Sequence, residues 1–373
     1  MRTLAIETLS VRSLRNLERV DVAFGPGFNV LCGDNGQGKT NLLEAIYAVS
    51  TSKSFRTHKA GELIAHGQSL ASVRASVVES GLIREQSLGI QAGGRRRLML
   101  EGKRPPTSAA YAVQTPAVVF HPGEVALSMG GGGERRRLLD RISLYLVPGS
   151  SSDLDRYSRA LRERQRALEV RGATGRDIPE WEELMVRHGL AIIEVRTVAA
   201  LRLAAGAKDA FARVAEPLGR LGVEYAPGSP LEAQAFRDAL LASRTKDARR
   251  GSASVGPHKD DLLLLLNDRP VRGCASQGQH RAIVLSLKSA EVEVIALARG
   301  VRPLLLLDDV SSELDRSRTR ALFAYLQQHD GQVFLSTTRP ELIDLSGSEG
   351  TPRRDFSVCA GVVRALNEGF SGT

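Results

Sequence analysis

Cysteine and long apolar runs are scarce in this chain of 373 residues, and each scarcity excludes a class of protein. The three cysteines, Cys32, Cys274 and Cys359, are odd in number and never form a C-x-x-C pair, which argues against a disulfide framework or a zinc site. The longest aliphatic runs, at residues 262–266 and 304–307, are the size of a strand and too short to span a membrane. These absences favour a soluble globular protein of a reducing cytoplasm, with no membrane partner.

We expect no export, because residues 1–14 lack an uninterrupted apolar stretch and a small-residue cleavage site. The hydrophobic fraction of 42% is enough for a substantial core and for two domains or one domain with a large insertion. The net charge is +9 with arginines in clusters, and such a surplus suggests a polyanionic partner, most commonly nucleic acid. A genome rich in arginine codons would give the same composition with merely solvated side chains, so charge alone leaves both interpretations open.

Residues 33–40 read GDNGQGKT and follow the apolar run FNVLC. The spacing is G-x-x-x-x-G-K-[ST], the P-loop that cradles nucleotide phosphates. The three glycines can take positive φ, so main-chain N–H groups can point at an anion where the next helix begins. We expect Lys39 on the β- and γ-phosphates and the Thr40 hydroxyl on Mg²⁺. A glycine-rich turn without a ligand is the alternative. The predicted nucleotide-binding residues here are Gly33, Asp34, Asn35, Gly36, Gln37, Gly38, Lys39 and Thr40.

A P-loop also needs a carboxylate for its Mg²⁺, normally at the end of an apolar strand. Residues 304–309 read LLLLDD, which places Asp308 and Asp309 together at the carboxyl end of a strand. We predict that Asp308 coordinates magnesium through water and that Asp309 is the catalytic group that polarises the attacking water. The alternative is an acidic turn without a ligand, but two adjacent charges in such a place are costly without a cation.

A second candidate anion site lies at residues 276–279, SQGQ. Ser276 and Gln279 have the spacing of a capping box, so a plain helix start is one explanation. Gly278, however, falls in the first helical turn, where it costs about 1 kcal/mol relative to alanine. We therefore predict that bare backbone here serves the γ-phosphate of a nucleotide bound elsewhere. The residues concerned are Ser276, Gln277, Gly278 and Gln279.

The chain changes character at the glycine run of residues 130–133. Strand-like runs and one strong helix precede it, helical periodicity follows it, and strand patterning resumes at Leu262. The pattern predicts a composite head formed by residues 1–125 and 250–373, and a helical insertion domain at residues 126–249.

One helix of the predicted insertion carries four arginines opposite its apolar face. They are candidate DNA contacts, although a solvated face fits the same pattern. These residues are Arg156, Arg159, Arg162 and Arg166.

The order of these motifs resembles that of the ABC-type ATPase heads of SMC chromosome proteins and their repair relatives, and more narrowly the RecF family of bacterial recombination mediators. The resemblance rests on five segments that recur in order: SLRNLERVDVAFGPGFNVLCGDNGQGKTNLLEAIY, SKSFRT, GPHKDDL, SQGQHRAIVLSLKSAEV and LLLLDDVSSELD. It implies an α/β fold, an ABC-type head with mixed sheets and a helical insertion. It makes residues 33–40 the Walker A segment, residues 276–279 the signature, and Asp308 with Asp309 the Walker B pair. The D-loop it implies is Ser312, Glu313, Leu314 and Asp315.

The same resemblance implies an ATP-dependent DNA-binding protein of recombinational repair and replication, with ATP and Mg²⁺ as cofactors and weak DNA-dependent ATPase activity. An ATP-dependent homodimer would clamp DNA at gaps or junctions, act with RecO and RecR, and indirectly load RecA in support of the SOS response. This sequence differs from the family pattern at two places that concern γ-phosphate sensing. Thr337 and Thr338 stand where a switch histidine is usual in transporter ATPases, and Lys259 stands where family members often have arginine. A transporter subunit is disfavoured by the SQGQ signature, and an SMC-like tether by the absence of long heptad arms.

Overall fold

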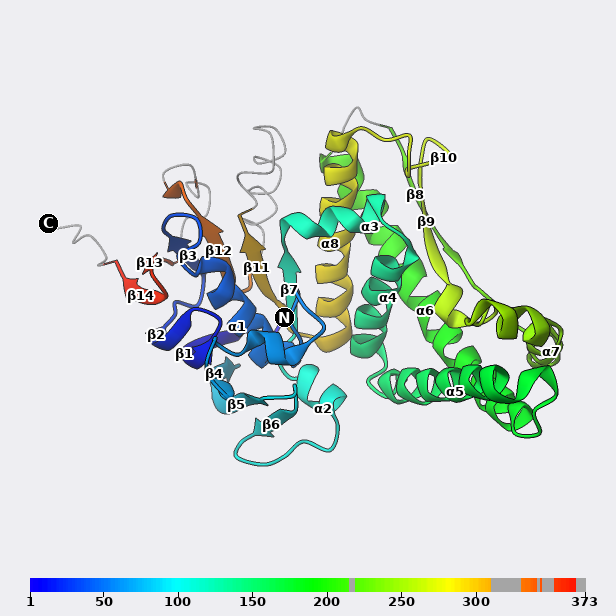
Figure 1. The fold of residues 1–373 in the computed structure, drawn as a ribbon. Helices are drawn as coiled ribbons and strands as arrows, with labels where there is room; N and C mark the ends of the chain where they lie inside the picture. The colour runs from blue at the N-terminus through cyan, green and yellow to red at the C-terminus, as the bar shows by residue number, and fades with distance from the viewer. Residues whose placement is uncertain (215–218, 310–329, 341–342, 344–351, 367–373) are drawn as a thin grey trace, which may run out of the picture. The chain divides into compact units, whose positions relative to one another are not determined.

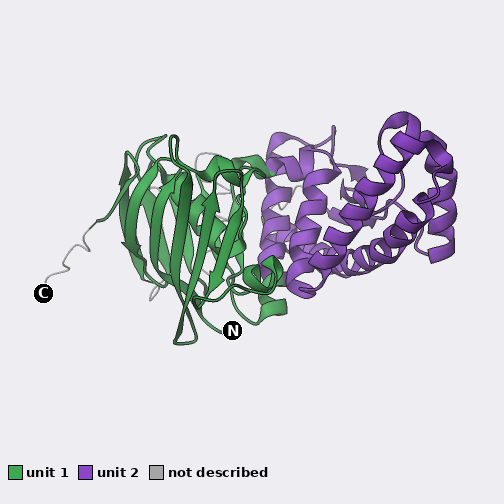
Figure 2. Cartoon of the chain, turned by 60° about the horizontal axis from the view of Figure 1, so that its bottom comes forward, with its two compact units in different colours: residues 1–124, 295–373 green, residues 125–294 purple. Residues whose placement is uncertain are grey.

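The computed structural model describes residues 1–214, 219–309, 330–340, 343 and 352–366, which form two compact units (Figures 1 and 2). Unit 1 holds residues 1–124 and 295–373, and unit 2 holds residues 125–294. From the sequence we predict that the second segment of the head begins at residue 250, whereas unit 2 continues to Val294. The reason is that helix α8 (Gln277–Arg299) buries Ile283 and Leu287 in the core of unit 2.

A six-stranded sheet with the order β14-β13-β3-β12-β11-β7 is the first layer of unit 1. Its neighbouring strands are parallel except for the edge hairpin β13–β14. Strands β3 and β11 are buried at every position, as is expected when both faces of a parallel sheet are covered. The bounds are β3 Phe28–Cys32, β7 Ala117–Phe120, β11 Leu304–Asp308, β12 Val333–Thr337, β13 Arg353–Cys359 and β14 Val362–Ala365.

An antiparallel sheet with the order β2-β1-β4-β5-β6 is the second layer of unit 1. Helix α1 (Lys39–Thr51) shares one apolar core with both sheets, and because it is apolar on nearly all sides it is buried from Leu42 onward. The strands are β1 Leu4–Leu14, β2 Leu17–Ala23, β4 Leu70–Glu79, β5 Leu82–Gln91 and β6 Arg96–Leu100, with the short helices η1 Ala60–Leu63, α2 Ser108–Ala112 and η2 Pro122–Val125.

Unit 2 is mainly helical but also contains a sheet with the order β10-β9-β8. The predicted helical insertion at residues 126–249 also contains strand β8, which pairs antiparallel with β9 and therefore depends on a partner far along the chain. In the described part of the chain no helix has the length and apolar character that crossing a membrane requires. The bounds are α3 Ala126–Met129, α4 Gly132–Leu146, α5 Ser150–Arg171, η3 Gly172–Thr174, α6 Ile178–Val214, β8 Leu221–Ala226, α7 Ala233–Arg250, η4 Pro257–Lys259, β9 Asp261–Leu266 and β10 Arg269–Pro270.

Candidate functional site

The P-loop joins the end of β3 to the start of α1 in unit 1. Gly33, Gly36 and Gly38 have φ values of +150°, +80° and +118°, which confirms the predicted positive φ. At two of them a side chain would also collide with a neighbour. A Cβ on Gly33 would lie 2.2 Å from the Val358 carbonyl oxygen, and one on Gly38 would lie 2.9 Å from Asn16 Oδ1. Conformation therefore favours glycine at all three positions, and at Gly33 a backbone carbonyl also leaves no space for a side chain.

The Lys39 side chain is buried inside the loop. Its Nζ donates hydrogen bonds of 2.6 Å to the Gly33 carbonyl and 2.8 Å to the Asp34 carbonyl. Burial lowers the pKa of Lys39, and the nearby carboxylates of Asp309 and Asp308 oppose that shift. The ammonium group thus lies where the loop would receive the phosphates of a nucleotide.

Strand β11 brings Asp308 to the first turn of α1. Thr40 Oγ1 donates a 2.8 Å hydrogen bond to Asp308 Oδ1, and Ser336 Oγ donates another of 2.8 Å to the same oxygen. The sheet register accounts for this meeting, because Asp308 pairs with Ser336 and Ser336 pairs with Leu31 near the end of β3. Two of the three residues were predicted, and the structure brings them together. Ser336 was missed, although it stands at the end of the apolar run VFLS.

Asp309 follows directly and has a φ of +48°. Its backbone N–H donates a 2.9 Å hydrogen bond to Ser336 Oγ. A non-glycine residue in the left-handed region is uncommon and is enriched at functional sites. Ser336 therefore links both members of the predicted Walker B pair to β12.

A carboxylate on α1 organises the residues around the start of this helix. Glu44 is fully buried and accepts hydrogen bonds of 3.0 and 3.1 Å from the Arg15 guanidinium. Arg56 Nη1 donates to Glu44 at 3.3 Å and to Asn41 Oδ1 at 2.7 Å. The segments SLRNL and SKSFRT, which the sequence marked only by resemblance, are thereby fixed beside the P-loop.

The signature segment begins α8 and lies in unit 2. Ser276 Oγ accepts a 3.3 Å hydrogen bond from the Gln279 N–H, and Gln279 Oε1 accepts one of 2.8 Å from the Ser276 N–H, which confirms the capping box. Ser276 and Gln277 are exposed. His280, which follows Gln279, is buried, and its Nδ1 lies 3.0 Å from Ser128 Oγ. This contact attaches the first turn of α8 to α3. Ser276 and Gln277 are therefore accessible to solvent at the start of α8.

Comparison with known proteins bears on these motifs. The family model described as RecF/RecN/SMC N terminal domain matches residues 5–349. The chain is 39% identical to the DNA replication and repair protein RecF of Anaeromyxobacter sp. (strain Fw109-5), over 92% of this chain and 95% of that protein. The chain belongs to the RecF family. It is also 35% identical to the RecF of Geobacter sp. (strain M21), over 95% of this chain and 98% of that protein.

Solved structures of RecF and of an Smc head domain are similar in fold to this RecF family member. Its fold is similar to that of the recombination mediator protein RecF-ATP in the RecFOR pathway, with a TM-score of 0.88, 27% identity and coverage of 98% of both chains. The Smc head domain of Pyrococcus furiosus is similar in fold alone, with a TM-score of 0.53 and 17% identity over 98% of this chain and 96% of that one. The expected α/β fold of an ABC-type ATPase head is confirmed.

The predicted D-loop of this RecF family member, Ser312, Glu313, Leu314 and Asp315, lies outside the described residues. Thr337 lies at the end of β12, and its Oγ1 accepts a 2.9 Å hydrogen bond from the Arg339 N–H. A threonine hydroxyl thus lies at the end of β12, where a switch histidine is usual in transporter ATPases.

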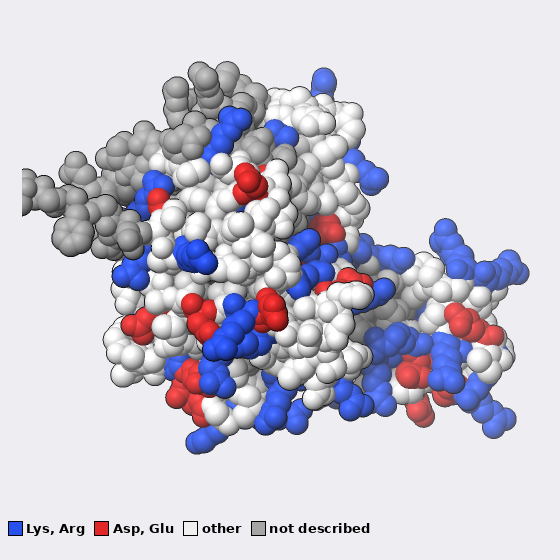
Figure 3. Space-filling model, turned by 60° about the vertical axis from the view of Figure 1, so that its left-hand side comes forward, with Lys and Arg blue, Asp and Glu red and all other residues white. Residues whose placement is uncertain are grey.

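The predicted DNA-binding arginines lie on α5. Arg156, Arg159, Arg162 and Arg166 are exposed, which confirms the amphipathic pattern but leaves DNA contact a prediction. Figure 3 shows Lys and Arg side chains spread over one face of the molecule with Asp and Glu among them, so the positive surplus on that face is not one patch.

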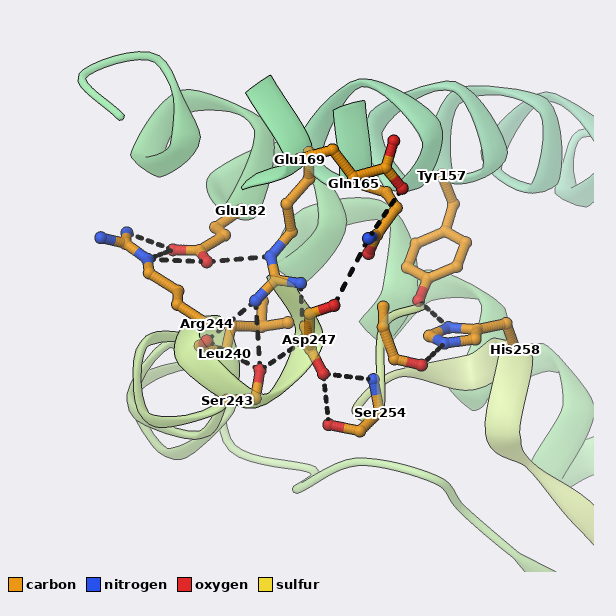
Figure 4. A network of polar contacts seen from close by, with 12 residues as sticks. Tyr157, Gln165, Glu169, Glu182, Leu240, Ser243, Arg244, Asp247, Ser254 and His258 are labelled. Carbon is orange, nitrogen blue, oxygen red and sulfur yellow. Dashed lines mark hydrogen bonds and ion pairs between the residues drawn. The ribbon is translucent and has the colours of Figure 1, made fainter. Parts of the chain in front are cut away.

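Arg164, in the middle of the same helix, is fully buried. Figure 4 labels three of the residues that contact it, Glu182, Ser243 and Asp247. Arg164 donates to Glu182 Oε1 at 2.9 Å and to Asp247 Oδ2 at 2.8 Å. Its Nη2 donates to the Leu240 carbonyl and to Ser243 Oγ. This guanidinium therefore fastens α5 to α6 and α7, a role that the sequence pattern did not reveal.

Proposed function

We propose that this protein is an ATP-dependent DNA-binding protein of recombinational repair, in which ATP joins two copies of the chain around DNA. One observation carries the proposal. Lys39 and Thr40 near one end of the sequence meet Asp308 near the other, with Thr40 bonded to Asp308 at 2.8 Å. A Walker A segment joined to a Walker B carboxylate is the arrangement that binds nucleotide with a metal ion.

The phosphates would lie on the N–H groups of residues 33–40, at the positive end of α1. Lys39 would exchange the Gly33 and Asp34 carbonyls for the β- and γ-phosphates. The hydroxyl of Thr40 and the carboxylate of Asp308 are the hard oxygen donors that Mg²⁺ prefers, so these residues fit the ion and would hold it. When bound, Mg²⁺ neutralises charge that develops on the phosphates.

Asp309 would orient and polarise the attacking water. Its carboxylate is one methylene shorter than that of glutamate, so slow hydrolysis and a long-lived dimer follow. Ser276, Gln277, Gly278 and Gln279 of one copy would close over the nucleotide of the other, together with the D-loop segment at residues 312–315. In this scheme hydrolysis acts as a switch that opens the dimer.

DNA would be held by electrostatic contacts to its phosphates, with Arg156, Arg159, Arg162 and Arg166 as the first candidates. Membership of the RecF family and the likeness to a RecF-ATP structure of the RecFOR pathway support RecO and RecR as partners, with RecA loaded indirectly.

The decisive experiment measures filter binding to gapped, duplex and single-stranded DNA with and without ATP and Mg²⁺. We expect ATP to strengthen retention of DNA by the unmodified protein and to have no effect on Lys39→Ala. Lys59→Ala is the matched control, because Lys59 is an exposed lysine of the same unit that pairs with Glu62 and is not part of residues 33–40. DNA retention by the unmodified protein that does not respond to ATP would contradict the proposal.

A further inference from the structure

The turn between β13 and β14 lies against the P-loop. The Ala360 N–H donates a 2.7 Å hydrogen bond to Gln37 Oε1, and the Gly361 N–H donates one of 2.8 Å to the Gln37 carbonyl. Both turn residues are left-handed, with φ values of +47° and +79°, as a two-residue hairpin turn of type I′ requires. Two consecutive N–H groups from the far end of the sequence thus hold one residue of the loop.

The backbone around Gln37 is closely packed at two glycines, Gly361 and Gly33. A Cβ on Gly361 would lie 2.1 Å from the Asn16 carbonyl oxygen, and one on Gly33 would lie 2.2 Å from the Val358 carbonyl oxygen. Asn16 Nδ2 also donates to the Gln37 carbonyl at 3.2 Å. Neither Gly361 beside Asn16 nor Gly33 beside Val358 could therefore carry a Cβ atom without a shift of the backbone.

We propose that Gln37 and the Ala360–Gly361 turn form a latch that positions the P-loop for phosphate, so that the C-terminal hairpin sets nucleotide affinity. Gln37 lies between Gly36 and Gly38, the most permissive part of the loop. Its carbonyl is held by the hairpin and by Asn16. Because a trans peptide plane points its C=O and N–H in opposite directions, the Gly38 N–H is directed away from the hairpin.

This latch rests on the nucleotide site proposed above and adds to it a residue pair that acts through the loop. A loop already fixed in its binding conformation loses less entropy when a ligand binds, so affinity rises without a new ligand contact. The coupling is reciprocal, since a nucleotide that favours the ordered loop must also favour the docked hairpin. Gln37 and Gly361 are therefore positioning residues.

The test uses the full chain with three substitutions. Gly361→Ala places a methyl group against the Asn16 carbonyl and does not alter the loop itself. Gln37→Ala removes one of the two acceptors at a half-buried position. The matched control is Gly81→Ala, which also lies in a two-residue hairpin turn of unit 1, with a φ of +82°, but whose Cβ would meet nothing within 4 Å.

Calorimetry with a non-hydrolysable ATP analogue and Mg²⁺ gives the affinity, and hydrogen exchange of residues 33–40 without nucleotide gives the order of the loop. We expect both latch variants to bind roughly ten-fold more weakly, the magnitude of one lost hydrogen bond. Their loop amides should exchange faster, whereas Gly81→Ala should match the unmodified protein in both measurements. A direct phosphate contact by the Gln37 side chain would not change exchange in the absence of nucleotide.

The outcomes separate the latch from the nucleotide site. Failure of the unmodified protein to bind the analogue, or equal binding by Lys39→Ala, overturns the site and the latch together. If Lys39→Ala loses binding while Gln37→Ala keeps the unmodified affinity and exchange rates, only the latch is wrong. Should Gly361→Ala fail to fold, Gln37→Ala alone decides, because its side chain is not part of the core.

Discussion

The Thr40 hydroxyl donates a 2.8 Å hydrogen bond to Asp308 across 268 positions of sequence. The same carboxylate oxygen accepts from Ser336, so three polar side chains meet at the carboxyl ends of β11 and β12. No turn or helix could bring these residues together locally. Their meeting requires the parallel register of three strands, and it is the relationship from which the nucleotide site is inferred.

Replacing Asp308 by alanine should abolish binding of ATP that depends on Mg²⁺ while the fold stays intact. The substitution removes the predicted metal carboxylate but no apolar packing. Calorimetry at matched magnesium concentrations measures the effect, and Asp21→Ala, an exposed carboxylate on β2, is the control. Unchanged affinity in Asp308→Ala would show that this carboxylate does not serve the nucleotide.

Replacing Ser276 by arginine should preserve ATP binding and remove both ATP-induced dimerisation and turnover. A bulky cation at the exposed start of α8 would block docking of a second copy, whereas the P-loop keeps all its residues. Sedimentation with and without ATP reports the dimer, and Thr245→Arg, which adds the same cation at an exposed position of α7, is the control. A Ser276→Arg protein that still dimerises with ATP would rule out the two-copy site.

Neutralising the α5 stripe by changing Arg156, Arg159, Arg162 and Arg166 to glutamine should weaken DNA binding and flatten its salt dependence. Each lost phosphate contact lowers the slope of log K against log salt by about 0.9 on duplex DNA. The control neutralises four exposed cations of unit 1 at Arg95, Arg97, Lys103 and Arg104. Loss of binding in the control alone would move the DNA surface to unit 1, and an affinity of the unmodified protein that ignores salt would refute electrostatic binding altogether.

Replacing Arg164 by alanine should lower the stability of unit 2 by about 3–5 kcal/mol, because it leaves the buried Asp247 carboxylate without the cation that pairs with it. Both carboxylates that accept from Arg164, those of Glu182 and Asp247, are buried, and Glu182 also keeps an ion pair with Arg244. Urea unfolding measures the loss. Arg166→Ala, an exposed arginine two positions along the same helix, should change stability by no more than about 0.5 kcal/mol. Equal effects of the two substitutions would contradict the fastening role.

The same network predicts a dependence of stability on pH. Burial alone would raise the pKa of Asp247, but hydrogen bonds from Ser254, Ser243 and Arg164 outweigh it and hold the pKa below its usual value of 3.8. A carboxyl group whose pKa is lower in the folded state binds fewer protons there, so its contribution is complete above pH 3.8 and is lost as the pH falls below that value. Asp247→Asn should lessen this acid-induced loss in urea unfolding between pH 5 and pH 3, a range set by that pKa. An unaltered pH profile in Asp247→Asn would assign the acid response to other groups.

Local chemistry let the sequence determine several features. The P-loop glycines adopt the predicted positive φ because glycine takes that backbone at the lowest cost, and Ser276 with Gln279 forms the predicted capping box within one helical turn. The exposure of Arg156, Arg159, Arg162 and Arg166 follows from helical periodicity. These features depend on neighbours within a few positions, which a sequence displays directly.

Other features were decided only by tertiary structure. Helix α8 belongs mostly to unit 2 because its apolar face packs against α4 and α6. Residues 221–226 form strand β8 because β9 pairs with them. Arg164 and Arg166 look alike in sequence, yet one is buried among carboxylates and the other is exposed. Ser336 and the hairpin turn at Ala360 reach the P-loop through sheet register alone. Each outcome depends on partners distant in sequence, whose meeting is determined by packing of the whole unit and by no local propensity.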